Sequence, residues 1–107
     1  MALPPLTAED RAAALQKAHD ARQKRAQVKT GLKTGTVTVS EVLKDAATDK
    51  TIAKMPVYDL LRAMPGVAEV RARQIMDRLG IAESRRIGGL GTNQRGALER
   101  EFEDALV

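Results

Sequence analysis

Apolar residues recur at intervals of three and four positions along most of this chain, which is the spacing of helices that bury one face. The clearest example is the segment 68–79, which ends before Gly80, a residue type that commonly terminates helices. The expected buried face of this helix consists of Ala72, Ile75, Met76 and Leu79. The last helix, from about Thr92, is expected to bury Leu98, Phe102 and Leu106 in the same way.

Turn and capping residues divide the chain into helices and predict an all-α fold. The run GTVTVS contains β-branched residues, yet Thr38 followed by Glu41 resembles a capping box and favours a helix over 39–47. Pro56 suits the first position of a helix that Pro65-Gly66 ends. The expected helical segments are 8–32, 39–47, a short turn over 49–55, 56–64, 68–79 and a final helix from about residue 92.

The first helix differs from the others because it lacks a continuous apolar face. Thr7 and Asp10 resemble a capping pair at its start, and the Ala, Gln, Lys and Arg residues that follow have high helix propensity. Its thin apolar stripe, which Arg25 interrupts, consists of Ala14, Ala18, Ala21, Val28 and Leu32. We therefore expect residues 1–35 to form a basic helical arm that projects from a compact helical domain over residues 36–107.

Charge indicates a polyanionic partner for this small chain. Its 107 residues carry 18 Lys and Arg against 14 Asp and Glu, which gives a formal net charge of +4. Residues 1–33 hold seven basic and three acidic groups, residues 34–67 hold four of each, and residues 68–100 hold seven and four. Two cationic zones therefore flank a neutral middle, and they could hold one duplex at two places or two duplexes once each.

Missing residue types exclude most catalytic chemistry. The absence of cysteine removes disulfides, thiolate nucleophiles and thiolate metal sites. His19 is the only histidine, and no nucleophile or metal partner lies at a recognisable spacing from it. No apolar run approaches the roughly 20 residues of a membrane span, and the N-terminus does not resemble a secretion signal. We expect a cytoplasmic protein that is not an enzyme and uses no metal, cofactor, membrane or small-molecule substrate.

The first candidate site is the turn Pro65-Gly66-Val67 between two helices. Its N–H groups, together with the start of the following helix, could hold a phosphate. The same tripeptide would also suit a plain turn between packed helices, but Arg71, Gln74 and Arg78 recur along one helix face beside it, and Arg73 points to another side. This placement favours phosphate binding.

The second candidate site begins with three glycines in four residues at the start of the last helix. Arg85 and Arg86 lie just before it. The turn is not a Walker loop, because no Gly-Lys-Ser/Thr follows, and it is not a dinucleotide fingerprint, because no strand precedes it. Its free N–H groups are expected over residues 88–94. A secondary basic stripe on the first helix is either a solvated face or a further backbone contact, and it consists of Arg22, Arg25, Lys29 and Lys33.

Several segments taken together resemble the actinobacterial integration host factor family over essentially the whole chain. They are the opening MALPPLT, the Ala-rich basic helix, KMPVYDLL, the MPGV…VRARQIM hairpin and ESRRIGGLGTNQ. The resemblance implies a single-chain, monomeric nucleoid-associated protein with a helix-two-turns-helix motif of the ribosomal type. It also implies binding of double-stranded DNA through its backbone with little sequence preference, DNA bending or compaction, and roles in phage integration and transcription.

The resemblance assigns the DNA contacts to the two turns. Those of the first turn are Pro65, Gly66, Val67, Arg71 and Arg73, and those of the second are Arg85, Arg86, Gly89, Leu90, Gly91, Asn93 and Gln94. Two departures are expected to weaken the grip. Ala68-Glu69 replaces a Gly-Lys that the family typically carries, which places a negative charge near the expected phosphate, and Gly88 replaces a further arginine.

Two other functions compete with this interpretation. The same hairpin is similar to those of a small-subunit ribosomal protein family and of formamidopyrimidine-type DNA glycosylases. Glycosylase chemistry is excluded, because it needs an N-terminal Pro-Glu and this chain begins Met1-Ala2. Binding of A-form RNA is the first alternative, although one Tyr and one Phe leave little for base stacking. An adaptor for an acidic protein partner is the second.

Overall fold

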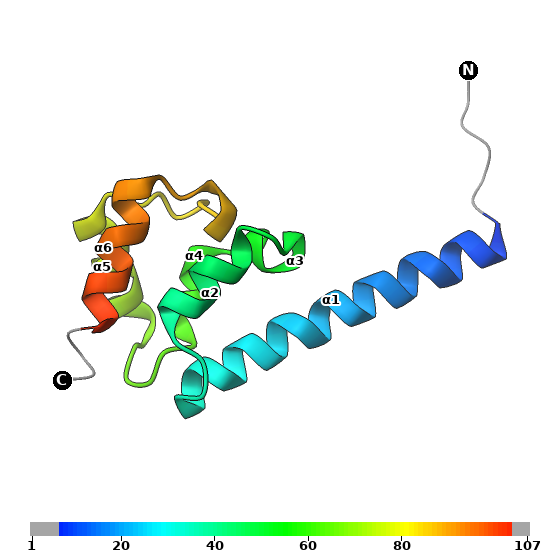
Figure 1. Ribbon diagram of the computed structural model, residues 1–107, viewed down its shortest axis with the longest axis horizontal. Coiled ribbons are helices and arrows are strands. Elements are labelled where there is room, and N and C mark those ends of the chain that lie inside the picture. Colours follow the sequence, from blue (N-terminus) through cyan, green and yellow to red (C-terminus); the bar gives the residue numbers. More distant parts are fainter. Residues whose placement is uncertain (1–6, 104–107) are drawn as a thin grey trace, which may run out of the picture.

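The computed structural model describes residues 7–103, and in this range the chain is helical with no strand (Figure 1). The elements in chain order are α1 (Ala8–Thr34), α2 (Val39–Ala46), α3 (Lys50–Ala53), α4 (Val57–Arg62), α5 (Glu69–Leu79), the 3₁₀ turn η1 (Ile87–Gly89) and α6 (Thr92–Glu103). The predicted all-α fold is confirmed. Only η1 has no counterpart among the predicted segments.

Side-chain caps begin the helices where the sequence predicts them. The Thr7 hydroxyl accepts a bond from the Asp10 N–H at 3.0 Å, and the Asp10 carboxylate accepts one from the Thr7 N–H at 3.2 Å. The Thr38 hydroxyl accepts from the Glu41 N–H at 3.1 Å, which confirms the helix over the β-branched run. The helix at Pro56 starts one residue later than predicted, because Pro56 is its N-cap rather than its first residue.

A single apolar core lies between α2, α4, α5, α6 and the end of α1, and no polar side chain is buried among the residues described. Its largest fully buried side chains are Leu32, Leu43, Met55, Leu60, Leu61, Ile75, Met76 and Leu98. The predicted buried faces of α5 and α6 are confirmed at Ala72 and Phe102 as well. Leu79 is only half-buried, and Leu106 lies outside the described residues.

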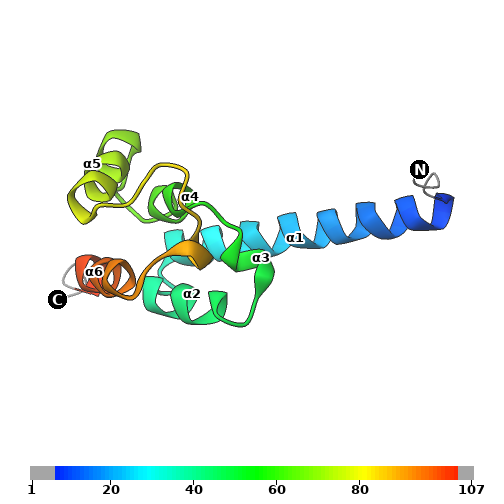
Figure 2. The same ribbon diagram turned by 90° about the horizontal axis from the view of Figure 1, so that it is seen from above.

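Most of α1 projects from the rest of the molecule, as Figures 1 and 2 show from two directions. All residues from Thr7 to Asp20 are exposed, and the Leu15 side chain is 70% exposed. Burial is reached only at Gly31 and at Leu32, which is 1% exposed in the core. The sequence assigns residues 1–35 to an arm, but Leu32, which lies in this range, is a core residue. The end of α1 therefore packs in the core, and the earlier part of the helix projects.

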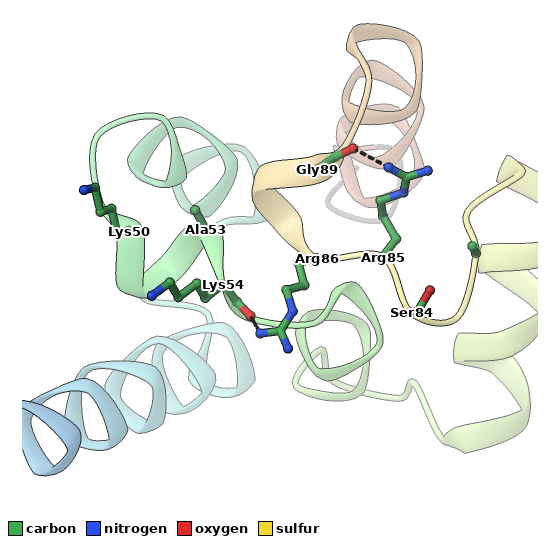
Figure 3. A pocket seen from close by; sticks show the side chains of 8 residues that line it. Lys50, Ala53, Lys54, Ser84, Arg85, Arg86 and Gly89 are labelled. Carbon is green, nitrogen blue, oxygen red and sulfur yellow. Dashed lines mark hydrogen bonds between the residues drawn. The ribbon is translucent and has the colours of Figure 1, made fainter. Parts of the chain in front are cut away.

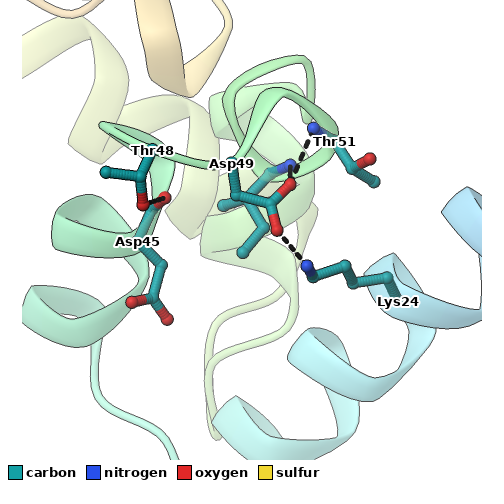
Figure 4. A network of polar contacts seen from close by, with 6 residues as sticks. Lys24, Asp45, Thr48, Asp49 and Thr51 are labelled. Atoms are coloured by element: carbon teal, nitrogen blue, oxygen red, sulfur yellow. Dashed lines mark hydrogen bonds and ion pairs between the residues drawn. The ribbon is translucent and has the colours of Figure 1, made fainter.

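Two ion pairs hold α1 against the core. The Lys24 ammonium contacts the Asp49 carboxylate, which also caps α3 by accepting the Thr51 N–H at 2.9 Å (Figure 4). The Lys24 contact lowers the pKa of Asp49, with a smaller contribution from the cap bonds, and partial burial opposes the shift. A second ammonium, that of Lys29, lies 3.7 Å from the Asp59 carboxylate at the start of α4. Both pairs are partly exposed, so each stabilises the contact only modestly.

A third ion pair fastens α6 to α5. Both terminal nitrogens of Arg78 donate to the Glu101 carboxylate, at 2.6 and 2.8 Å. This two-pronged bond lowers the pKa of Glu101 and raises that of Arg78. The bond joins residues 23 positions apart and so ties the two helices that follow the two candidate turns.

The lowered pKa values of Asp49 and Glu101 predict how the free energy of unfolding depends on pH. A carboxyl whose pKa is lower in the folded state stabilises the fold above its unfolded pKa, and this contribution is lost as pH falls through the folded value. The free energy of unfolding, measured with urea, should therefore be level above about pH 5 and fall below about pH 4. Glu101→Gln should lower the plateau and flatten this fall. Asp45→Asn is the control, because the Asp45 carboxylate points away from Lys24 and Asp49 in Figure 4, and it should keep the wild-type profile. Equal profiles for both variants would contradict the assignment.

Candidate nucleic-acid interface

The first turn is a tight connection between α4 and α5 that leaves helix N–H groups exposed. Gly66 has a φ of +76°, a left-handed conformation that other residues adopt only with strain. The Val67 N–H donates to the Met64 carbonyl at 3.2 Å, and the buried Val67 side chain fixes the turn to the core. Ala68, the N-cap of α5, supplies no side-chain cap. The N–H groups of the first turn of α5 therefore remain available to an anion.

Cationic side chains from two other helices border the first turn. A cleft of about 370 Å³ beside Pro65 and Gly66 is lined by Lys29 and Lys33 of α1 and by Arg62 of α4. The fold thus brings two residues of the secondary stripe to the first turn. Their partners in that stripe, Arg22 and Arg25, lie further out along α1. Arg62 was not predicted, because only the packing of α4 against α1 places it there.

The two α5 arginines predicted near the first turn have different surroundings. Arg71 lines a groove that includes Pro65, Gly66 and Val67. Arg73 is engaged by carboxylates instead: its guanidinium lies 3.1 Å from Glu69 on the same helix and 4.0 Å from Glu83. Arg73 also partly neutralises the charge of Glu69.

The chain that leads into the second turn is hydrogen-bonded to the residues around the start of α4. The Val57 N–H donates to the Arg85 carbonyl at 3.0 Å, and the Ile87 N–H donates to the Met55 carbonyl at 2.9 Å. These bonds form an antiparallel bridge between Pro56 and Arg86. The buried side chains of Ile87 and Leu90 anchor the same stretch in the core. The Leu90 side chain therefore packs in the core, and only the Leu90 backbone could contact a ligand.

The prediction that N–H groups would be free throughout residues 88–94 is wrong for the middle of the turn. The Gly89 N–H donates to the Arg86 carbonyl at 2.9 Å, and the Leu90 N–H donates to the Ile87 carbonyl at 3.2 Å. The Gly91 N–H donates to the Gln94 side chain at 3.0 Å. A sequence pattern rich in glycine does not reveal that η1 uses these groups. The available N–H groups are those of Thr92 to Gln94, in the first turn of α6. These groups have no acceptor within the helix, because no carbonyl of α6 precedes them by four residues.

The Gln94 side chain braces the second turn. Its oxygen accepts the Gly91 N–H, and its nitrogen donates to the Gly80 carbonyl at 2.9 Å, where α5 ends. Gln94 therefore joins the end of one candidate helix to the start of the other. This role explains its presence without a direct contact to a ligand, whereas the neighbouring Asn93 is exposed and has no such bond within the described residues.

Arg85 and Arg86 are each held in place by a backbone carbonyl, as Figure 3 shows. Arg85 donates to the Gly89 carbonyl at 3.0 Å, and Arg86 donates to the Lys54 carbonyl at 2.7 Å. A guanidinium has five N–H donors, so each arginine keeps several for a ligand. A cleft of about 620 Å³ lies beside them, and the residues that line it are Lys50, Ala53, Lys54, Ala82, Ser84, Arg85, Arg86 and Gly89.

Comparison with known proteins places this geometry in a family. Residues 32–102 match the S13-like H2TH domain. The chain is 58% identical over 102 residues to the integration host factor of Streptomyces coelicolor, and the match covers 95% of each chain. It is 51% identical over 105 residues to the integration host factor of Mycobacterium tuberculosis, covering 98% of this chain and 100% of the relative.

The chain belongs to the integration host factor family. The resemblance seen in the sequence is therefore confirmed. A solved structure of this family, described as sIHF bound to an 8bp palindromic DNA, matches with a TM-score of 0.80 and 53% identity, covering 81% of this chain and 98% of that one. Both turns of this integration host factor family member lie within the range 32–102 that matches the H2TH domain.

None of the helices in the range 7–103 is both long and apolar enough to span a membrane. In the same range, no group of three or more His, Asp or Glu side chains is arranged to hold a metal ion.

Proposed function

We propose that this protein binds double-stranded DNA through its phosphate backbone, with little sequence preference, and that it bends or compacts DNA in the nucleoid as a monomer. One observation carries the proposal: the first turn leads into a helix start without a side-chain cap, and each of the two turns borders a cleft that has Lys and Arg in its lining. Helix N–H groups and cationic side chains together are a site for phosphate oxygens. The relatives named integration host factor, and the DNA in the related solved structure, support this choice of polyanion.

Low sequence preference follows from the groups that make the site. Backbone N–H groups, lysines and arginines at helix starts fix a protein on phosphates and carry no sequence information directly. Asn93 is the exposed amide side chain in the second turn and is the residue there best suited to a base edge. Contacts of Pro65 and Gly66 with DNA would be through shape and backbone.

A salt series on matched DNA and RNA duplexes tests the proposal. With about five to eight Lys and Arg contacts, log affinity for DNA should fall against log salt with a slope of roughly −4 to −7. Unrelated DNA sequences should differ little. Tighter binding of A-form RNA would favour the ribosomal alternative. Failure to bind either duplex at physiological salt, measured by fluorescence anisotropy, would leave the acidic protein partner as the remaining function.

Reversing the charge of Glu69 should strengthen DNA binding. Glu69 is the first residue of α5, beside the N–H groups proposed to hold a phosphate, and it also pairs with Arg73. Glu69→Lys replaces repulsion with attraction and releases Arg73, so we expect affinity at low salt to rise about tenfold. Glu9→Lys, in the exposed first turn of α1, is the control for net charge. Equal gains for the two variants would show that the first turn is not a phosphate site.

A further inference from the structure

We propose that Lys50 and Lys54 of α3 extend the DNA interface beyond the second turn, by holding one backbone phosphate together with Arg86. This inference rests on the proposed function and adds an element, α3, that neither the sequence nor the turn motif assigns to DNA. The site is the cleft of about 620 Å³ between α3 and the stretch 84–89 (Figure 3).

The charge of this cleft is uncompensated. Four cationic side chains line it, Lys50, Lys54, Arg85 and Arg86, and none of its lining residues is acidic. All four are exposed. Like charges gathered on one small surface repel one another, and a bound anion relieves this repulsion. The cleft volume of about 620 Å³ can hold a phosphodiester group.

The acidic residue nearest to these lysines in sequence is Asp49, and its carboxylate has other partners. Asp49 directly precedes Lys50, but its carboxylate accepts the Thr51 and Ile52 N–H groups at 2.9 and 3.3 Å and pairs with Lys24 of α1. Because Asp49 is committed to the start of α3 and to α1, it does not neutralise the lysines that follow it.

Close packing fixes α3 against the second turn. A Cβ atom added at Gly88 would lie 2.8 Å from the Ala53 Cβ atom and 3.2 Å from the Ala53 carbonyl oxygen. Glycine at this position therefore permits the approach. The bond from Arg86 to the Lys54 carbonyl, at 2.7 Å, crosses the same contact and joins residues 32 positions apart. Lysines and arginines are thus presented by one rigid unit.

The chemistry of the cleft suits a phosphodiester. Arg86 has donors left after its bond to Lys54, and a planar guanidinium can bind two oxygens of a phosphate side by side. The lysines act as point charges at the rim and help to neutralise the single negative charge of the same phosphate. Ser84 adds a hydroxyl donor at the far wall.

The test compares two double variants with the same loss of net charge. Lys50→Ala/Lys54→Ala removes the proposed contacts, and Lys17→Ala/Lys44→Ala removes two exposed lysines that do not line the cleft. Binding of a 20-base-pair duplex (about two helical turns) is followed by anisotropy across a salt series. The first variant should bind about tenfold more weakly at low salt, with a slope shallower by about one to two. The second should remain close to wild type.

The outcomes separate this inference from the function beneath it. If wild type binds DNA and the two double variants behave alike, the α3 site is overturned while the proposed function stands. If wild type does not bind duplex DNA, the proposed function itself fails. Circular dichroism confirms that both variants are folded.

A second measurement identifies the ligand atom. Single phosphates of the duplex are replaced in turn by neutral methylphosphonate. At one position or two adjacent positions the replacement should weaken wild type more than Lys50→Ala/Lys54→Ala, because the variant has already lost the lysine part of that contact and keeps only the part of Arg86. If every position weakens both proteins equally, the lysines do not hold a particular phosphate and the inference is overturned.

Discussion

Replacing Arg85 and Arg86 together with alanine is expected to weaken binding to every duplex by about 2–4 kcal/mol, since each charge-assisted phosphate contact contributes roughly 1–2 kcal/mol. Both guanidiniums are oriented by backbone carbonyls at the edge of the cationic cleft of about 620 Å³. Little side-chain entropy then remains to be lost on binding. The loss should be the same for unrelated sequences, because the contacts are to phosphate. Anisotropy titrations on three unrelated duplexes measure it.

The control must separate binding from folding and from net charge. Arg11→Ala/Lys17→Ala removes two charges from the exposed part of α1 and should change affinity little. Losing the bonds to the Gly89 and Lys54 carbonyls should cost at most about 1 kcal/mol of stability each, because both carbonyls can bond to water instead. If the arginine variant binds like the control, the second turn is a packing device and the DNA surface lies elsewhere.

Shortening α1 is expected to have two very different effects on stability. Removing residues 1–20 deletes, within the described range 7–20, only exposed side chains, and it should leave the free energy of unfolding nearly unchanged. Removing residues 1–33 also deletes Leu32, and losing a buried leucine costs about 2–5 kcal/mol, a large share of the stability of a small domain. Urea unfolding followed by circular dichroism measures both.

The same truncations locate the part of α1 that acts on DNA. The shorter deletion keeps the basic stripe from Arg22 to Lys33 and should keep duplex affinity. A point variant, Leu32→Ala, reproduces the packing loss without removing charge, so it shows how much of any defect is due to folding. Full stability of the protein without residues 1–33 would mean that Leu32 does not contribute to the core, contrary to the structure.

The sequence predicts the helices well because their ends depend on neighbouring residues. Thr7 with Asp10 and Thr38 with Glu41 are separated by three positions, so their caps form whenever the helix does. Gly66 and Gly80 take left-handed conformations that local sequence alone suggests. The buried face of α5 follows from helical spacing in the same way.

The chemistry of the two sites depended more on contacts between distant residues. The N–H groups of the second turn are consumed by η1 and by Gln94, which depends on the chain folding back against Met55 and Gly80. The positions of Lys50 and Lys54 at that turn depend on Gly88 touching Ala53. No periodicity or spacing in the sequence predicts such contacts between distant residues. The isolated apolar residues Ile87 and Leu90, in a stretch where no helix is predicted, are the sequence feature that indicates packing of this turn in the core.

The form of α1 makes it a mechanical lever. Its 27 residues span about 40 Å at the usual helical rise, and its buried part lies at one end, around Leu32, while the partly exposed ion pairs of Lys24 and Lys29 add only a modest restraint. A rotation of ten degrees about Leu32 would displace the start of the helix by roughly 6 Å, although core side chains beside Leu32 would shift by far less. Small repacking around Leu32 therefore produces a large displacement of the start of α1, and a probe attached at the exposed Leu15 would detect this displacement.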